Sequence, residues 1–204
     1  FGSAGYEVNG EIHISEQYID FSIGKFPFEV LMHEIGHSLD LKHPFENPML
    51  PPLEDRATNT VMTYNHTYPS AKDLGIFDIV TIQYLFGVNA EARNLNDTYS
   101  TADRYIWDGG GEDVISLVNC TAQVHISLTP GSWSFVGNKE GSILSDGQFF
   151  IGFGTYIENV IGSTWDDVIT GNTLDNILTG GAGADTLDGG TGIVTHYHPA
   201  FGAR

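Results

Sequence analysis

The sequence has 204 residues, enough for one large domain or two small ones with a buried core. It carries 26 acidic and 8 basic residues, a net charge of −18, so it offers too few cations to bind nucleic acid or an anionic membrane surface. The 41% hydrophobic content is that of a globular protein rather than a disordered acidic tail. Cys120 is the single cysteine, which excludes an intrachain disulfide, and no apolar run approaches the roughly 18 residues of a membrane anchor.

The first half of the chain predicts helices joined by irregular segments. β-Branched and aromatic residues alternate within residues 11–21, which predicts a strand there. Apolar residues then recur at helical spacing behind a proline, which predicts a helix near 27–40. A proline-rich irregular stretch follows over 44–60. A second helix with buried apolar positions is predicted from about 73 to 86, where a glycine follows that suits a helix cap.

Glycine is distributed unevenly, with 7 of the 25 glycines in residues 1–100 and 18 in residues 101–204. This shift predicts two different architectures, with only short strands from Tyr105 onward. Residues 94–204 hold 13 acidic and 3 basic residues, a net charge of −10, and ten of the acids are Asp. The short arm of Asp suits a ligand held against a tight turn.

A nine-residue repeat begins at positions 162, 171 and 180, where the units read GSTWDDVIT, GNTLDNILT and GGAGADTLD. A polar residue recurs at the sixth position and an aliphatic one at the eighth, as in the pattern G-G-x-G-x-D-x-U-x. In that pattern a glycine-rich turn directs carbonyls and an Asp toward Ca²⁺, and a short strand points its aliphatic residue inward. Stacked carboxylates repel without a cation, so the repeat predicts a calcium-binding roll. The alternative is a Gly/Asp-rich loop with chance periodicity.

The strongest motif is the run HEIGHSLDLKH, which starts at His33. His33 and His37 are four residues apart on the predicted helix, so both imidazoles project toward one zinc ion, with Glu34 beside them. His43 reaches the same ion only if the helix breaks near Asp40. Three neutral nitrogen ligands leave a coordination position open for water, as in a catalytic zinc site. The alternative is a set of ordinary surface or core histidines.

This run resembles the metzincin zinc signature H-E-x-x-H-x-x-G-x-x-H, and its residues are similar to those of the serralysin family of secreted bacterial metalloproteases. The segment TVMTY resembles the Met-containing turn of that family, which implies that Met62 is the floor of the site and Tyr64 a further zinc ligand. The segment LGIFDIVTIQYLFGVN resembles the helix that follows this turn. The similarity runs from about Tyr6 to Gly192.

The resemblance implies an α+β fold in two parts. Residues 1–92 are expected to be the C-terminal part of a metzincin, or zincin-like, catalytic domain with the zinc helix, the Met-turn and the following helix. Residues 93–192 are expected to form a right-handed parallel β-roll, a β-solenoid that binds calcium. Residues 193–204 follow no repeat and are expected to be an irregular tail.

Calcium ligands are expected in three places. The segments NDTY and IWDGGGEDVI resemble calcium-binding segments of the family near the domain junction and early in the roll, and the sixth positions of the repeat supply further carboxylates. The candidate calcium ligands are Asp97, Gly110, Asp113, Asp167, Gly183 and Asp185.

Three departures from the family pattern carry expectations of their own. Asp40 replaces the turn-making glycine of the zinc signature, and Asp adopts the left-handed conformation more readily than most residues. Only 32 residues precede His33, so the chain is expected to lack most of the upstream β-sheet of the family, including the strand that pairs with substrate. The repeat also stops early, which predicts truncation at both ends.

Taken as a family member, the protein is expected to be a secreted zinc endopeptidase that hydrolyses internal peptide bonds. One catalytic Zn²⁺ would be held by His33, His37 and His43, with Tyr64 bound at rest and stabilising the oxyanion during reaction, and Glu34 would act as general base. Several structural Ca²⁺ ions would hold the roll. The expected partners are protein or peptide substrates, with no nucleic acid and no membrane anchor, and a monomer is expected.

Two other hypotheses stay open at this point. The chain could be a calcium-stabilised binding or structural module with a vestigial protease half, which the missing sheet favours and the intact Glu34 disfavours. It could also be a metzincin outside the serralysin group, which the roll disfavours. The extracellular location is inferred from calcium, because weak sites built from repeats fill only where Ca²⁺ is millimolar.

Overall fold

The computed structural model describes residues 4–65, 71–143 and 145–197. The chain divides into two compact units, Phe1–Gly87 and Val88–Arg204. The boundary predicted after residue 92 therefore falls inside the second unit. The reason is local: the Gly109 amide donates to the Arg93 carbonyl (3.3 Å), and a Cβ on Gly109 would lie 2.7 Å from the Ala90 carbonyl oxygen. Close packing on Gly109 holds this segment to the second unit.

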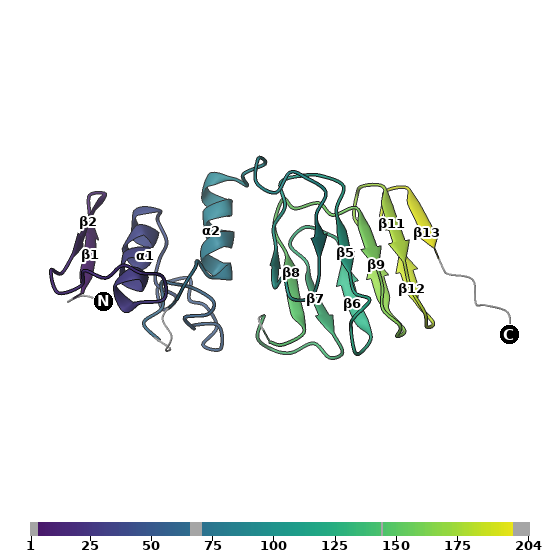
Figure 1. Ribbon diagram of the computed structural model, residues 1–204, viewed down its shortest axis with the longest axis horizontal. Coiled ribbons are helices and arrows are strands. Elements are labelled where there is room, and N and C mark those ends of the chain that lie inside the picture. The colour runs from purple at the N-terminus through teal and green to yellow at the C-terminus, as the bar shows by residue number, and fades with distance from the viewer. Residues whose placement is uncertain (1–3, 66–70, 144, 198–204) are drawn as a thin grey trace. The chain divides into compact units, whose positions relative to one another are not determined.

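The first unit opens with a β-hairpin, labelled in Figure 1. Strand β1 (Gly5–Val8) pairs antiparallel with β2 (Glu11–Ile14), and the turn between them is Asn9 and Gly10 with φ of 54° and 80°. Two residues with positive φ make the turn that best matches the twist of a hairpin. The strand predicted within 11–21 is confirmed, but it ends at Ile14. Its partner β1 was not predicted, although the Asn-Gly dipeptide signals a hairpin.

Helix α1 (Phe26–Ser38) confirms the first predicted helix and ends two residues before the predicted bound of 40. Its last turn is closed by two hydrogen bonds that a left-handed residue makes possible: the Asp40 amide donates to the His37 carbonyl, and the Leu41 amide donates to the Gly36 carbonyl (both 3.0 Å). Asp40 itself has φ 62°. This is the Schellman arrangement, with Asp in the position that glycine usually takes. The helix thus breaks where the zinc signature requires.

Helix α2 (Ile76–Phe86) confirms the second predicted helix but starts three residues later than predicted. Its first turn is capped from within, because the Asp78 carboxylate accepts from the Gly75 amide (2.8 Å). The helix ends before Gly87, whose φ is 86°. In the described ranges, neither α1 nor α2 combines the length and the apolar character that a membrane-crossing helix needs.

The second unit is built from strands of two to four residues in the described ranges, as predicted from Tyr105 onward. They are β3 Thr98–Tyr99, β4 Tyr105–Ile106, β5 Val114–Ser116, β6 Val124–Ser127, β7 Trp133–Val136, β8 Gln148–Ile151, β9 Asn159–Ile161, β10 Val168–Thr170, β11 Asn176–Thr179, β12 Thr186–Asp188 and β13 Val194–Tyr197. One sheet has the order β12-β10-β6-β7-β8-β4 and the other the order β13-β11-β9-β5-β3. We call this second unit the roll unit.

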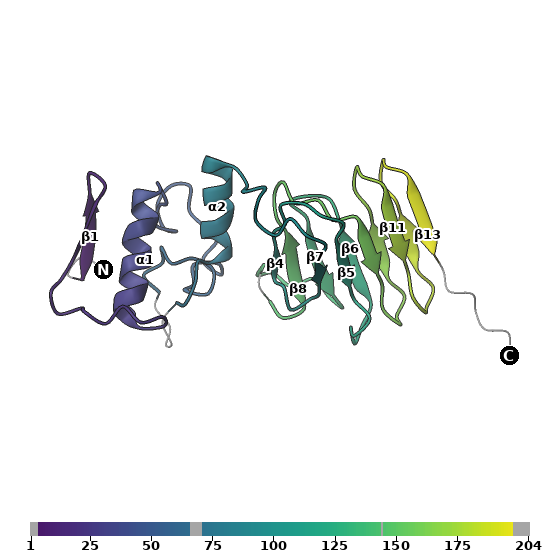
Figure 2. The ribbon, with the colours of Figure 1, turned by 45° about the horizontal axis from the view of Figure 1, so that its top comes forward.

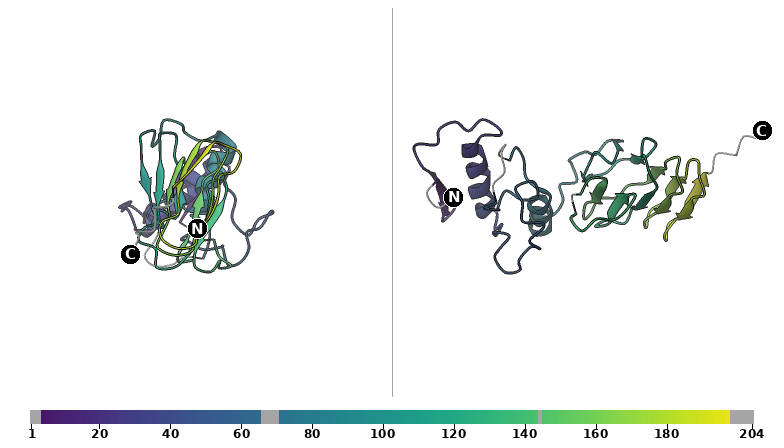
Figure 3. Two further views of the ribbon diagram at one scale, coloured as in Figure 1. Left: turned by 90° about the vertical axis from the view of Figure 1, so that its right-hand side faces the viewer. Right: turned by 90° about the horizontal axis from the view of Figure 1, so that it is seen from below.

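From β9 onward, successive strands alternate between the two sheets of the roll unit (Figure 2). Parallel partners are two nine-residue repeats apart, so β10 pairs with β12 in the register Ile169↔Leu187, and β9 pairs with β11 in the register Val160↔Leu178. Seen end-on, these strands lie one behind another (Figure 3). The eighth-position residues of the first two repeat units, Ile169 and Leu178, are fully buried, as the pattern predicts.

Two predictions for the roll unit are wrong in part. The sheet is not parallel throughout, because β6 pairs antiparallel with β7, and β7 antiparallel with β8. Residues 124–151 follow no nine-residue repeat, so nothing in them imposes parallel stacking. The tail predicted over 193–204 is not irregular throughout either, since β13 pairs parallel with β11 in the register Leu178↔His196. Backbone pairing with an existing strand extends the sheet there without the repeat pattern.

One apolar core runs through the roll unit. Its fully buried members include Phe149, Ile106 and Ile115 from strands outside the nine-residue repeat, and Ile169 and Leu178 from the repeat strands β10 and β11. Fully burying such a side chain contributes about 1.5–3 kcal/mol. A separate cluster in the first unit joins Leu41, Val61 and Met62, directly beside the histidines described next.

Candidate metal centres

The histidines of the zinc signature converge in the first unit. His33 and His37 come from α1, and His43 comes from the loop after the left-handed turn at Asp40. The Nε2 atom of His37 lies 3.1 Å from Nε2 of His33 and 3.2 Å from Nε2 of His43. The three ligand atoms all lie within 4.8 Å of one another. The sequence-predicted ligand set is therefore brought together around one point.

The Nδ1 atoms of the three rings face hydrogen-bond acceptors. Nδ1 of His33 lies 2.8 Å from the Val61 carbonyl oxygen, Nδ1 of His37 lies 3.1 Å from that of Leu41, and Nδ1 of His43 lies 2.7 Å from Oε1 of Glu46. A carbonyl only accepts, so Nδ1 of His33 and of His37 must carry a hydrogen and donate it. A hydrogen bond from His43 also lowers the pKa of Glu46, which keeps that carboxylate an acceptor.

With hydrogen on Nδ1, each neutral ring presents a bare lone pair at Nε2. The lone pair on His37 lies about 3 Å from those on His33 and His43, and such lone pairs repel one another unless a cation sits among them. Burial lowers the pKa of His33 to about 3, so its ring stays neutral and ready to ligate. A hydrogen-bond acceptor at the ring nitrogen that does not bind the metal fixes the tautomer and the orientation of a metal-binding histidine. The donor set thus fits a zinc ion with three nitrogen ligands.

The turn under the histidines is held by a carboxylate that the sequence did not single out as functional. The Asp78 carboxylate accepts from the Thr60 hydroxyl (2.5 Å) and from the Val61 amide (2.8 Å). The same Val61 residue offers its carbonyl to His33. Asp78 is buried, and burial raises its pKa. Asp78 therefore links α2 to the orientation of the first histidine, a contact that only tertiary packing reveals.

Met62 lies fully buried where the resemblance expected a floor for the site. Its Sδ occupies the space that a Cβ on Gly36 would fill, so the glycine inside the HEIGH motif lets the Met-turn approach α1. Both α1 histidines, His33 and His37, flank this glycine in sequence. Packing of Met62 on Gly36 therefore sets the distance between the Met-turn and the histidine-bearing helix.

Glu34 lies on α1 between His33 and His37, and Tyr64 lies two residues after Met62, at the end of the Met-turn segment. Glu34 is buried, and burial raises its pKa. A Cβ on Gly5 would lie 3.3 Å from Glu34 Cγ, so glycine in β1 leaves room beside this carboxyl group. The ring of Tyr64 lies 4.7 Å from that of His43 and 5.7 Å from that of His33, centre to centre. Burial and the charges of Glu34 and Glu46 raise the pKa of Tyr64, so its phenol stays protonated.

A pocket of about 480 Å³ lies next to His43 in the same unit. Its lining is largely apolar and comes from the loop after α1, the Met-turn and α2, with Leu41, Leu50, Met62 and Phe77 among the walls. A pocket of this size and character accepts an apolar side chain.

A carboxylate cluster forms a second candidate metal centre, in the roll unit. Ligand oxygens of Asp97, Asp108 and Asp113 all lie within 4.8 Å of one another. Asp108 and Asp113 are buried, and Oδ2 of Asp113 has no hydrogen-bond partner among the described residues. Burial, with the charges of Asp108 and Glu158, raises the pKa of Asp113 to about 6. A divalent cation with oxygen ligands removes this repulsion and satisfies the bare oxygen.

The cluster joins two of the predicted calcium residues and adds one. Asp97 and Asp113 are in it, and Gly110 lies beside it, with φ 143° and an amide that donates to Asp108 (2.6 Å). Asp108 was missed. The sequence did offer a signal for Asp108 as a calcium ligand. Asp108 lies two residues before Gly110, inside the segment IWDGGGEDVI that resembles a calcium-binding loop.

The repeat carboxylates Asp167 and Asp185 differ in their surroundings. Asp167 is buried with both oxygens used: Oδ1 accepts from the Val124 amide and the Ser163 hydroxyl, and Oδ2 accepts from the Ser163 amide. Oδ1 of Asp185 accepts from the Asp167 amide, but its Oδ2 is buried without a partner among the described residues. Asp185 is therefore better suited than Asp167 to bind a cation, because both Asp167 oxygens already accept hydrogen bonds, two of them from Ser163 in the same turn.

Gly183 shows why the Asp185 turn needs glycine. Its φ is 122°, and a Cβ there would lie 2.7 Å from the Trp165 carbonyl oxygen of the preceding turn on that side. Glycine at this position lets the Trp165 carbonyl approach the turn that contains Gly183 and Asp185, and such close approach is needed where backbone oxygens ligate Ca²⁺.

Comparison with known proteins places this architecture in a family. The family model described as peptidase M10 serralysin C terminal matches residues 79–194, more than half of the chain. Serralysin G of Dickeya chrysanthemi is 34% identical over 179 residues, covering 72% of this chain and 36% of that protein. The metalloprotease AprA of Pseudomonas entomophila (strain L48) is 30% identical over 208 residues, covering 82% of this chain and 41% of that protein.

A serralysin of Photorhabdus sp. (strain Az29) is 32% identical over 186 residues, covering 74% of this chain and 37% of that protein. The chain thus spans well under half the length of these curated relatives. On the match to residues 79–194, the chain belongs to the peptidase M10 serralysin C-terminal family.

Proposed function

We propose that the chain carries the zinc centre of a metalloendopeptidase that cleaves internal peptide bonds of proteins. The observation that carries this proposal is the convergence of the three Nε2 atoms of His33, His37 and His43, with the Nδ1 atoms of His33 and His37 donating to backbone carbonyls. Relatives named serralysin and metalloprotease, at 30–34% identity, support the same reaction class.

A zinc ion bound by these nitrogens supplies a Lewis acid that polarises the scissile carbonyl and acidifies water. Glu34 takes the proton of the attacking water and returns it to the leaving amine, and its raised pKa brings it closer to the working pH of such a base. The Tyr64 phenol, protonated at neutral pH, donates a hydrogen bond to the oxyanion. Tyr64 as a further zinc ligand at rest belongs to the same proposal.

Substrate recognition is assigned to the apolar pocket beside His43. Its walls of Leu41, Leu50 and Phe77 suit an apolar side chain next to the cleaved bond. Substitution of Leu50 by Asp is expected to raise KM for such substrates more than it lowers kcat, since it removes binding without touching the reacting atoms.

Calcium belongs to the roll unit in this proposal. The bare, buried oxygens of Asp113 and Asp185 support cation binding there, and an ion at each would tie neighbouring turns together. Such sites fill where Ca²⁺ is millimolar, which supports a secreted, extracellular protein. A right-handed winding of the roll, as in a β-solenoid, and a monomeric state are part of the same proposal.

The test is Glu34→Gln in the protein that carries this chain. Zinc content is expected to stay at one ion per chain while hydrolysis of an unfolded protein substrate is lost, because the base is removed and no ligand is. Asp40→Asn, which keeps a residue tolerant of positive φ outside the ligand set, is the matched control. Zinc binding with no hydrolysis in the wild-type protein would favour the vestigial calcium-stabilised module instead.

A further inference from the structure

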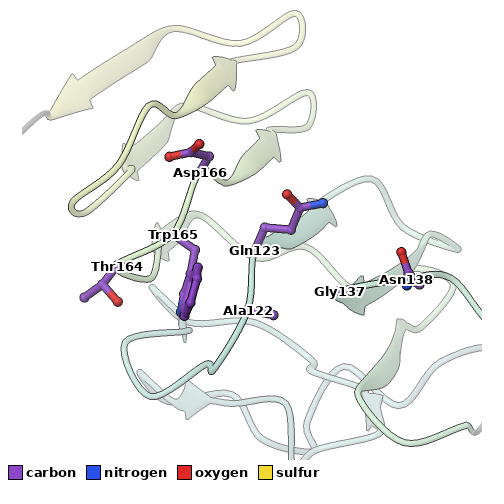
Figure 4. A pocket seen from close by; sticks show the side chains of 7 residues that line it. All are labelled: Ala122, Gln123, Gly137, Asn138, Thr164, Trp165 and Asp166. Atoms are coloured by element: carbon purple, nitrogen blue, oxygen red, sulfur yellow. The ribbon is translucent and has the colours of Figure 1, made fainter.

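A pocket of about 400 Å³ lies on the surface of the roll unit, and its lining residues lie outside both the histidine cluster and the cluster of Asp97, Asp108 and Asp113 (Figure 4). Its walls come from three segments that are far apart in sequence: 122–123 before β6, 137–138 after β7, and 164–166 in the turn before β10. Figure 4 shows the indole of Trp165 in this pocket, with Gln123 and Asn138 on the segments across from its turn.

Trp165 departs from the repeat at the point where it lines this pocket. It is the fourth residue of the unit GSTWDDVIT, where the pattern asks for glycine and where Gly183 stands in the complete unit. Its side chain is 49% exposed, so the core does not account for it. The opposite wall is formed by residues 122–123 and 137–138, which flank the antiparallel pair β6 and β7, a second departure from the repeat. Two departures of the roll unit from the repeat therefore meet at one pocket.

The turn that presents Trp165 is held rigidly. Its backbone amide donates to the Ser163 hydroxyl (3.0 Å), and that hydroxyl donates to the buried Asp167 carboxylate (2.9 Å). The neighbouring Asp166 is fixed as well, because its Oδ1 accepts from the Ala184 amide of the next turn (2.8 Å). A platform fixed in this way loses little conformational entropy when a ligand binds.

The groups around the indole suit a polyhydroxylated, uncharged ligand. Gln123 and Asn138 each offer an amide oxygen and an NH₂ group, although Nε2 of Gln123 also lies 3.3 Å from Nε2 of His125, and Thr164 offers a hydroxyl. These pair with neighbouring hydroxyl groups in both directions. Among the described residues, none that lines the pocket is basic, and Asp166 disfavours an anion. Lys139, next to Asn138 in sequence, lies instead 4.4 Å from the centre of the Trp133 ring.

We propose that this pocket binds a neutral hexopyranose oligosaccharide, with the apolar C–H face of one sugar ring stacked on Trp165. The polarised C–H groups of a pyranose meet the negative face of the indole, and the amides of Gln123 and Asn138 bind its hydroxyls. The shallow position on the roll surface leaves both ends of a chain free to extend. This site is independent of zinc and of the proposed hydrolysis.

The test is isothermal titration calorimetry of the calcium-loaded chain with cellohexaose, maltohexaose and chitohexaose. At least one is expected to bind at one site with a Kd of about 1 mM or below. Trp165→Gly, which restores the repeat residue and so preserves the turn, is expected to weaken that binding at least tenfold. Gln123→Ala is expected to weaken it severalfold, and circular dichroism checks the fold of both variants.

Tyr156→Ala is the matched control, because Tyr156 is similarly exposed at 46% and lies outside the pocket. Unchanged affinity in this variant supports the assignment. A hyaluronan hexasaccharide, which is anionic, is expected to bind more weakly than the neutral sugars because of Asp166. Binding by none of the three neutral sugars, or binding that survives Trp165→Gly, would overturn the proposal.

Discussion

Replacing Asp78 by Asn tests how α2 supports the zinc centre. The carboxylate accepts three hydrogen bonds, from the Thr60 hydroxyl, the Val61 amide and the Gly75 amide. Asn can keep its oxygen toward the two amides, but its NH₂ group then faces the Thr60 hydroxyl, which already accepts from the Met62 amide (3.0 Å). The hydrogen bonds that remain are also weaker, because their acceptor is now a neutral amide oxygen instead of a charged carboxylate.

The magnitude follows from those bonds. A hydrogen bond to a charged group contributes about 1.5–3 kcal/mol against about 1 kcal/mol for a neutral one. Three weakened bonds, offset by the relief of no longer burying a carboxylate, leave a net destabilisation of about 2–3 kcal/mol. Because Val61 also orients His33, zinc affinity is expected to fall by about 10–100-fold.

The assay is urea unfolding followed by the helical circular dichroism signal, together with competitive zinc titration. Asp73→Asn is the matched control, since Asp73 precedes the same helix but is exposed and, among the described residues, accepts a hydrogen bond from the adjacent Leu74 amide alone. It is expected to change stability by less than about 0.5 kcal/mol. If Asp78→Asn is no more harmful than Asp73→Asn in either measurement, the support assigned to Asp78 is wrong.

Three further predictions concern the zinc centre and the calcium sites of the roll unit. Tyr64→Phe is expected to lower kcat far more than it changes KM, because its hydroxyl acts on the transition state; steady-state kinetics with equal kcat would make Tyr64 a packing residue. Calcium is expected to stabilise the roll unit by about 2.7 kcal/mol per site at a hundredfold excess over Kd. The response is measured as melting temperature against free Ca²⁺. Asp185→Ala should weaken it more than Asp175→Ala, because Asp175 is an exposed residue at the fifth position of its repeat unit. Equal responses of the two variants would remove Asp185 from the ligand set. The third concerns pH in the calcium-free protein: the pKa of Asp113 is raised from 3.8 to about 6 on folding, so protonation stabilises the fold. This contribution to the free energy of unfolding is fully present below about pH 4 and is lost as the pH rises through 6. Saturating Ca²⁺ should abolish this loss. The measurement is chemical denaturation of the calcium-free protein at several pH values, and a stability that rises between pH 4 and 6 would contradict the prediction.

Features that depend on residues close in sequence were predictable. The spacing of His33 and His37 and the break at Asp40 follow from helix geometry and from a residue tolerant of positive φ. The buried places of Ile169 and Leu178 follow from a repeat that sets each strand against the one two units away. In each case the local pattern fixes the relevant contact.

Features that depend on distant partners were not predictable from one sequence. Asp78 meets Thr60 and Val61 only when α2 packs on the Met-turn, and no motif marks it as a support. The antiparallel meander over 124–151 has no repeat to set its direction, and β13 forms by pairing with β11 rather than by pattern. The bare oxygen of Asp185 and the saturated ones of Asp167 look alike in sequence, because both occupy the sixth position.

Zinc K-edge X-ray absorption on the purified, zinc-loaded chain tests the central claim most directly. The three-histidine centre predicts one tightly bound zinc ion with nitrogen and oxygen neighbours at about 2.0–2.1 Å and the outer-shell scattering of imidazole rings. The same measurement on His43→Ala is expected to lose one imidazole. A chain that binds no zinc, or one whose spectrum shows no imidazole scattering, would contradict the account.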